Sequence, residues 1–422
     1  MPESARLSHG QLSVWRDIRG LGRDRWHEAN TRTIWAVADD GEPGVDEVEH
    51  AVLGLAGRHE SLRTVYELTD PYAPAQRVLP SAGEAGSGAV DSGVVECRPE
   101  EFDELVRGLA AEPFDLRAAP SWRFRVVTVG GRPRAVVMIK HHITADGWSN
   151  AILESEFRAA LHPAAEASAT VTAPAPRELA AWQHSDGQRA RRAALTAHWE
   201  RIFDLDAASP GTAGGAAAPG TASQYSVRSR QAYQRAQRLA ERFSVPVSSV
   251  VLAAFTWSVA RAAGPGTPVV QLMSSNRFVQ PWKNVVSSMN QWTAVSLGDA
   301  PGEFEPFVAH VHTQSLPAYR HGMYDVDEVD ALRDRVRRGR DPYQASCAFN
   351  FLTDAAAPPG SAPESGTVRE VPFSLIGHPC YLRATDEGGR TLELRLRTMG
   401  IADGVTRDIL EGTVARLSDA TP

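Results

Sequence analysis

The segment from residue 122 to residue 161 constrains the fold most, because it combines two apolar runs, a turn and a helical pattern. The runs at 122–129 and 134–142 are separated by Gly130 and Gly131, which are a strong turn signal. Together they predict a pair of antiparallel strands. From 149 to 161 apolar residues recur at helical spacing. We therefore expect an α+β fold in which mixed sheets are covered by helices.

The length of the chain predicts two domains. At 422 residues it exceeds the size at which a single core usually splits. A stretch rich in Ala, Gly, Pro and Thr at 206–223 cannot bury enough apolar surface to order itself. We therefore expect an N-terminal half at 1–205, a flexible linker at 206–223 and a C-terminal half at 224–422.

Periodicity predicts further elements in both halves. Helices are expected at 45–58, 246–263 and 406–417, the second with Ser248 or Ser249 as its N-cap. Alternation of Leu with charged residues at 392–397 predicts a half-buried strand.

Composition limits which binding partners and which cell compartment we expect. The net charge of -7 argues against nucleic acid or an anionic membrane as the main partner. No apolar run approaches the roughly 20 residues that a membrane span needs. Cys97, Cys347 and Cys380 are far apart and have no metal-binding spacing, so a reducing cytoplasm is the expected location.

Two adjacent histidines at the end of the second apolar run carry the most chemical information. Neighbouring side chains of a strand point to opposite faces, so His141 and His142 should diverge. Gly147 lets a ligand approach the main chain, and the helix that follows brings free N–H groups and a positive dipole end. A histidine and a helix terminus together suit a carbonyl that becomes an oxyanion.

Two alternative interpretations remain open from the residues alone. The histidines can be structural, or His141, His142 and Asp146 can bind zinc, although diverging side chains disfavour a shared ion. The chain has no G-x-S-x-G elbow and no Walker-type phosphate loop, so a serine hydrolase or an ATP-using enzyme has no support.

The segment from His141 to Ser149 resembles the HHxxxDG motif of condensation domains of nonribosomal peptide synthetases, within the chloramphenicol-acetyltransferase-like superfamily. Further segments are similar to other motifs of that family and follow its order along the chain: LSHGQLSVW at 7–15, RHESLRTVY at 58–66, PFDL at 113–116, ELAAWQ at 178–183, and DPYQ at 341–344 followed by Phe349 to Phe351.

This resemblance implies a V-shaped pseudodimer of two acetyltransferase-like mixed-sheet halves with a central channel. It implies that His142 orients or deprotonates the acceptor nucleophile and that Gly147 offers a backbone N–H to the oxyanion. Asp146 is then structural and pairs with Arg277 from the second half, and His141 is structural too. The family needs no bound cofactor or metal, because its substrates arrive on the phosphopantetheine arms of carrier proteins.

The segment at 287–293, SSMNQWT, departs from the family's G-x-F-V-N-T pattern. Its bulky Trp292 and missing glycine bear on specificity for donor or acceptor. Residues expected to line the substrate channel are Trp148, Ser149, Met289, Gln291 and Trp292.

The function expected from the resemblance is that of a monomeric condensation enzyme, free-standing or excised from a larger chain, that forms an amide bond in natural-product biosynthesis. The donor is an acyl or aminoacyl thioester on a peptidyl or acyl carrier protein. The acceptor is an amine, or as second choice a hydroxyl that gives an ester. Alternatives are an acyltransferase of the same fold that uses coenzyme A, and a non-catalytic module that recruits a partner enzyme.

Overall fold

The structure is a computed structural model that describes residues 4–37, 43–80, 90–161, 174–205, 221–264, 268–298, 303–341, 343–354, 366–373 and 378–418. The chain forms two compact units. Unit 1 comprises Met1–Arg192, Ser275–Gln291 and Met323–Val326, and unit 2 comprises Ala193–Ser274, Trp292–Gly322 and Asp327–Pro422. Unit 1 thus takes two short segments from the expected C-terminal half. Most of the predicted linker, 206–220, lies outside the described residues.

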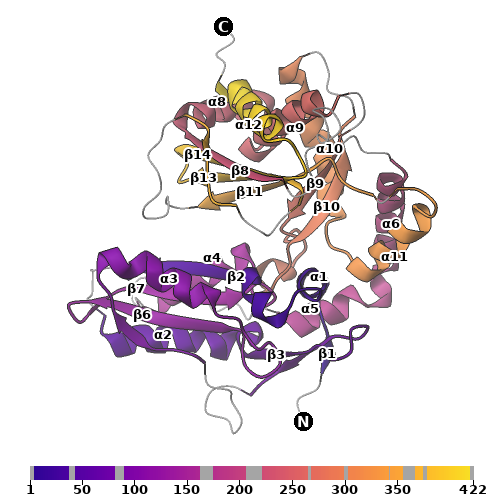
Figure 1. Ribbon diagram of the computed structural model, residues 1–422. Helices are drawn as coiled ribbons and strands as arrows, with labels where there is room; N and C mark the ends of the chain where they lie inside the picture. The colour runs from indigo at the N-terminus through magenta and orange to yellow at the C-terminus, as the bar shows by residue number, and fades with distance from the viewer. Residues whose placement is uncertain are drawn as a thin grey trace. The chain divides into compact units, whose positions relative to one another are not determined.

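Unit 1 contains a four-stranded mixed sheet in the order β2-β7-β6-β5 and a three-stranded sheet in the order β1-β4-β3, within its described part (Figure 1). The strands are β1 (Ala5–Arg6), β2 (Asn30–Ala36), β3 (Thr64–Glu67), β4 (Ala75–Val78), β5 (Val94–Glu96), β6 (Trp122–Val129) and β7 (Arg132–His141). The helices are α1 (His9–Ile18), α2 (Val45–Arg58), α3 (Phe102–Ala111), α4 (Gly147–Leu161) and α5 (Pro176–Gln183), with short 3-10 helices η1 (Arg23–Ala29), η2 (Glu60–Arg63), η3 (Pro99–Glu101), η4 (Asp186–Gln188) and η5 (Trp282–Asn284).

The apolar run in β7 is continuous because both faces of its sheet are covered. Val136 and Met138 pack into one core cluster with residues of α2 and α4. Val137 and Ile139 point the other way, into a cluster with residues of α1 and α3. The strand that ends at His141 is therefore packed on both sides.

Unit 2 contains a seven-stranded mixed sheet in the order β10-β9-β11-β13-β14-β8-β12. Its strands are β8 (Ala222–Ser229), β9 (Val269–Ser274), β10 (Gln291–Ser296), β11 (Cys347–Asp354), β12 (Arg369–Glu370), β13 (Cys380–Glu387) and β14 (Thr391–Met399). Its helices are α8 (Arg230–Phe243), α9 (Val247–Ala263), α10 (Phe304–Arg320) and α12 (Asp403–Ser418). Two further helices, α6 (Arg189–Asp204) and α11 (Val326–Val336), begin in unit 1 and continue into unit 2.

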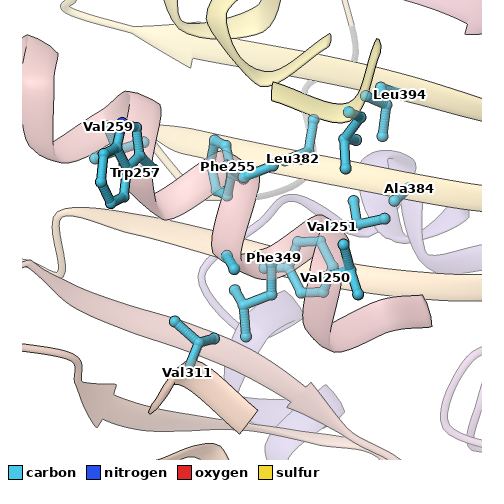
Figure 2. Close-up of a cluster of buried hydrophobic side chains, with 14 of the residues drawn as sticks. Val250, Val251, Phe255, Trp257, Val259, Val311, Phe349, Leu382, Ala384 and Leu394 are labelled. Atoms are coloured by element: carbon cyan, nitrogen blue, oxygen red, sulfur yellow. The ribbon is translucent and has the colours of Figure 1, made fainter. Parts of the chain in front are cut away.

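The core of unit 2 lies between α9 and one face of this sheet. Figure 2 shows Val250 and Phe255 of α9 beside Phe349, Leu382 and Leu394 of the strands. On β14 the leucines point into this core, so Glu393, Arg395 and Arg397 share the opposite face. One side of the sheet is therefore apolar and covered by helices, and the other carries polar groups.

The predicted elements are confirmed with small shifts. The strand expected at 134–142 is Arg132–His141, and it pairs with Trp122–Val129 through Gly130 and Gly131, both of which have positive φ. The helix expected from residue 149 begins at Gly147. The cap predicted for α9 is wrong: Pro246 is the N-cap residue, and the Ser249 Oγ lies 3.0 Å from the His312 Nδ1 instead.

No single helix among the described residues has both the length and the apolar composition to cross a membrane. The helices α8 and α9 meet both criteria only when they are taken together, and the chain bends by 109° between them.

Candidate active site

His141 and His142 diverge as expected. The chain leaves β7 after His141, whose N–H donates to the Ser121 carbonyl at 2.9 Å, while the His142 N–H donates to the Ala29 carbonyl at 2.8 Å. The side chain of His141 is fully buried, and that of His142 is half-buried. Burial, together with the charge of the neighbouring His142, lowers the pKa of His141 to about 3. His141 is therefore a neutral core residue at physiological pH, and His142 is the imidazole that a substrate can reach.

The ring of His142 contacts a short chain of polar side chains. Its Nδ1 lies 3.3 Å from the Ser288 Oγ, and that hydroxyl lies 3.3 Å from the Asn290 Oδ1. When the hydroxyl of Ser288 donates to Asn290, its oxygen is left to accept a proton from Nδ1. The Nε2 of His142 then carries the lone pair and faces away from this chain.

Asp146 and Arg277 form a buried ion pair. The Nη2 of Arg277 donates to the two carboxylate oxygens of Asp146 at 2.8 and 3.0 Å. The same guanidinium donates from Nη1 to the carbonyls of Lys283 at 3.1 Å and Val285 at 2.5 Å. The pairing predicted between these two residues is therefore present, and both partners lie in unit 1.

The carboxylate of Asp146 also fixes the start of α4. It accepts the Ser149 N–H at 2.9 Å and the Ser149 hydroxyl at 2.8 Å, and its other oxygen accepts the Met289 N–H at 3.0 Å. Burial raises the pKa of this carboxyl, but the charge of Arg277 and the hydrogen bonds from Ser149 outweigh burial, so the net pKa is below its ordinary value. An ionised Asp146 thus ties the segment after the histidines to the segment at 287–289.

These bonds leave the zinc alternative unsupported. Both oxygens of Asp146 already accept hydrogen bonds from protein groups. The group of potential metal ligands that the described residues bring close together lies elsewhere, at His9, His184 and Asp325.

Gly147 is the first residue of α4 and is exposed. A Cβ added to it would meet no atom within 4 Å. Its N–H belongs to the first turn of the helix, where N–H groups have no carbonyl partner within the helix and the dipole is positive. The backbone at Gly147 can therefore approach an anionic oxygen without steric hindrance.

Gly10 brings α1 against the site, a role that the sequence did not indicate. A Cβ at this position would collide with the Ser288 carbonyl and would lie 2.8 Å from the Met289 Cα. Only a residue without a side chain permits this approach of two backbones. Gly10 thus supports the segment that carries Ser288. Its place within the motif at 7–15 was the available signal.

The five residues predicted to line the substrate channel differ in exposure. Trp148 is 44% exposed, and Trp292 is half-buried. Ser149, Met289 and Gln291 are buried, which corrects the prediction for these three. Ser149 is held by Asp146 and Arg277, and the Gln291 side chain donates to the Tyr324 carbonyl at 2.8 Å. Because they are buried, their side chains offer a substrate almost no surface.

Comparison with known proteins identifies the family of the chain. The sequence model of the condensation domain family matches residues 36–367. The chain belongs to this family. Condensation domains are acyltransferases that form peptide or ester bonds in the biosynthesis of nonribosomal peptides and related secondary metabolites.

Individual relatives are distant. The bassianolide nonribosomal cyclodepsipeptide synthetase of Beauveria bassiana is 25% identical over 312 residues, which are 69% of this chain and 10% of the synthetase. The chain therefore spans about a tenth of the length of that relative.

Two solved condensation domains show the same fold. The domain that mediates chain release from the enacyloxin polyketide synthase aligns with a TM-score of 0.77 and 18% identity, over 100% of this chain and 84% of that one. The first condensation domain of the calcium-dependent antibiotic synthetase, in complex with a substrate analogue, aligns with a TM-score of 0.72 and 18% identity over 99% and 96%. The expected α+β fold of two mixed-sheet halves is confirmed.

Proposed function

We propose that this condensation domain joins an acyl or aminoacyl group, delivered as a thioester on a carrier protein, to an amine acceptor, with His142 as the catalytic residue. The observation that carries the proposal is the half-buried imidazole of His142 beside the open helix start at Gly147. The Asp146–Arg277 pair holds that helix start in place.

In this mechanism the acceptor nitrogen attacks the thioester carbonyl carbon. The Nε2 of His142 hydrogen-bonds to the acceptor and takes the proton that the nitrogen loses. The carbonyl oxygen becomes an oxyanion, and the Gly147 N–H donates to it. When the tetrahedral intermediate collapses, the carbon–sulfur bond breaks and the thiolate of the carrier arm takes the proton from His142. The products are the amide and the free carrier thiol, so no external cofactor is required.

Ser288 and Asn290 act as positioning residues in this scheme. The chain from the His142 Nδ1 through the Ser288 Oγ to the Asn290 Oδ1 favours the tautomer with a proton on Nδ1. That tautomer leaves Nε2 free to accept a proton. His141 and Asp146 contribute through packing and ion pairing.

Carrier proteins are the partners that this reaction needs, and the relatives support them. The relatives include the bassianolide nonribosomal cyclodepsipeptide synthetase, of which the matched segment is about a tenth. An intracellular setting, where loaded carriers are made, agrees with this proposal.

The test is condensation between a loaded carrier protein and an amine acceptor, followed by the mass of the product. We expect the His142→Ala variant to lose about 100- to 10,000-fold in rate. His50→Ala, a change of an exposed histidine on α2, is the matched control and should leave the rate unchanged. If His142→Ala condenses as fast as the parent, His142 is not the catalytic residue. If the parent accepts acyl-coenzyme A without a carrier, the donor assignment is overturned.

A further inference from the structure

Arg397 of β14 is a buried arginine with almost no polar partners. It is 2% exposed. Its Nη2 lies 2.9 Å from the thioether sulfur of Met399, a weak acceptor, and its Nε and Nη1 have no hydrogen-bond partner among the described groups. A guanidinium is always charged, and a buried donor that is left unsatisfied is costly. A group of this kind calls for a polar partner, and the described residues provide none for its Nε and Nη1.

The carboxylates on the same face of the sheet are already engaged. Glu393 accepts from Arg395 at 2.9 Å, and Glu387 accepts from Arg228 at 3.0 Å. None of the ion pairs between described residues includes Arg397. The positive charge at this point of unit 2 is therefore uncompensated within the described part of the chain.

Aromatic rings surround the guanidinium. Phe373 lies over it at 4.8 Å, and Tyr381 of β13 is its direct neighbour across the sheet. Trp292 packs edge-on against Tyr381 at 5.6 Å and against His378 at 4.5 Å. Burial and the charge of Arg397 lower the pKa of His378 to about 4, so this ring is neutral at physiological pH. The cluster thus combines one fixed cation with apolar walls, and Trp292 is the residue at which the sequence departs from its family.

We propose that Arg397, with Trp292 and Tyr381 as walls, binds an oxyanion carried by a ligand of this enzyme. The ligand chemistry is a carboxylate or a phosphate on a partly apolar body. If the proposed function holds, two sources are available: a carboxylate on the acceptor or donor substrate, and the phosphate of the carrier's phosphopantetheine arm. Either would supply the acceptors that Nε and Nη1 lack, and a charge-assisted hydrogen bond in a dry site is stronger than one in water.

The test is calorimetric titration of the whole protein with three probes: benzoate, phosphopantetheine and pantetheine without the phosphate. We expect the parent to bind benzoate or phosphopantetheine, and Arg397→Met to lose at least tenfold in affinity for that probe. Arg395→Met, on the same strand and the same face, is the matched control and should bind like the parent. Arg397→Lys keeps the charge and should retain part of the affinity.

The pattern across the probes identifies the source. Binding of benzoate alone assigns the site to a substrate carboxylate, and binding of phosphopantetheine but not pantetheine assigns it to the carrier arm. If the parent binds none of the anions, or if Arg397→Met binds them as tightly as the parent, the proposal is overturned. Because these titrations do not depend on turnover, His142→Ala should bind like the parent even when it does not condense. A failure of the site and a failure of the catalytic proposal are thus distinguishable.

Discussion

Arg277 in unit 1 and Arg397 in unit 2 are both buried, but with different sets of partners. Arg277 in unit 1 is 4% exposed, and Arg397 in unit 2 is 2% exposed. The first donates to the Asp146 carboxylate, to the Ser149 hydroxyl and to backbone carbonyls, which leaves only its Nε without a partner. The second has a thioether sulfur and aromatic faces.

The contrast separates two uses of a buried charge. A guanidinium that is paired and hydrogen-bonded within the chain joins segments that are distant in sequence, here 146–149 and 277–289. A buried guanidinium without such partners joins no segments of the chain. The free-energy cost of burying its charge is offset only when a ligand binds. Removing the carboxylate partner of Arg277 should therefore destabilise unit 1. Removing Arg397 itself should change the stability of unit 2 little.

The largest effect is expected for Asp146→Ala. It leaves Arg277 buried without its carboxylate, which should cost about 3–5 kcal/mol in the free energy of unfolding. Urea unfolding measures this loss. Asp186→Ala, which removes an exposed pair with Arg189, should change stability by less than about 1 kcal/mol. Equal losses in the two variants would show that the buried pair is no more important than a surface pair.

A smaller effect is expected from acid, and it should appear in both units. His141 in unit 1 and His378 in unit 2 have pKa values of about 3 and about 4, against 6.5 for an unperturbed histidine. The unfolded chain therefore takes up these protons first. The contribution of these two neutral histidines to the free energy of unfolding is fully present above pH 6.5. It falls as the pH drops towards 4, by up to about 1.4 kcal/mol per pH unit for each residue.

Urea midpoints between pH 7 and pH 5 measure this slope. His378→Gln, which keeps a polar neutral side chain, should make the slope shallower. A slope unchanged by this substitution would mean that His378 is not held neutral beside Arg397.

Gly10→Ala tests the close packing on the unit 1 side. The added Cβ meets the backbone of Ser288 and Met289, which cannot rotate away as a side chain can. We expect a loss of about 1–3 kcal/mol in the free energy of unfolding, as for other overpacked sites. Gly54→Ala is the control, because it lies within α2 with no atom within 4 Å of the added carbon. That variant should gain up to about 1 kcal/mol, since alanine favours helix.

Ser288→Ala should reduce kcat with little change in KM. It removes the hydroxyl that links His142 to Asn290, an interaction worth about 1 kcal/mol or roughly fivefold in rate. Ser288→Thr keeps a hydroxyl and should restore most of the rate. A Thr variant as slow as the Ala variant would point to packing and not to the hydrogen bond.

The smallest effect on stability is expected for Arg397→Met, and it completes the contrast with Asp146→Ala. Replacing a buried, unpaired cation by an apolar side chain of similar length should leave the free energy of unfolding unchanged or raise it by about 1 kcal/mol. Thermal unfolding without anions is the measurement. A loss comparable to that of Asp146→Ala would show that Arg397 is a structural residue after all.

Sequence alone determined the local elements and the family. The hairpin of β6 and β7 follows from two apolar runs joined by Gly130 and Gly131, and the helix Val45–Arg58 follows from helical spacing. Both are patterns among residues that are close in the sequence. The motif at 141–147 likewise marked the site, and the resemblance to the family named Arg277 as the partner of Asp146.

Only the tertiary structure decided which distant residues meet. Ser288 reaches His142 and Gly10 meets Met289 across separations of 146 and 279 residues in the chain, and no pattern in the sequence encodes such contacts. The same holds for Arg397. Its charge is visible in the sequence, but the lack of a carboxylate beside it depends on how the strands pair and which side chains share a face. The free energy of a buried charge is set by its neighbours in space, so the roles of these residues could be assigned only from the folded chain.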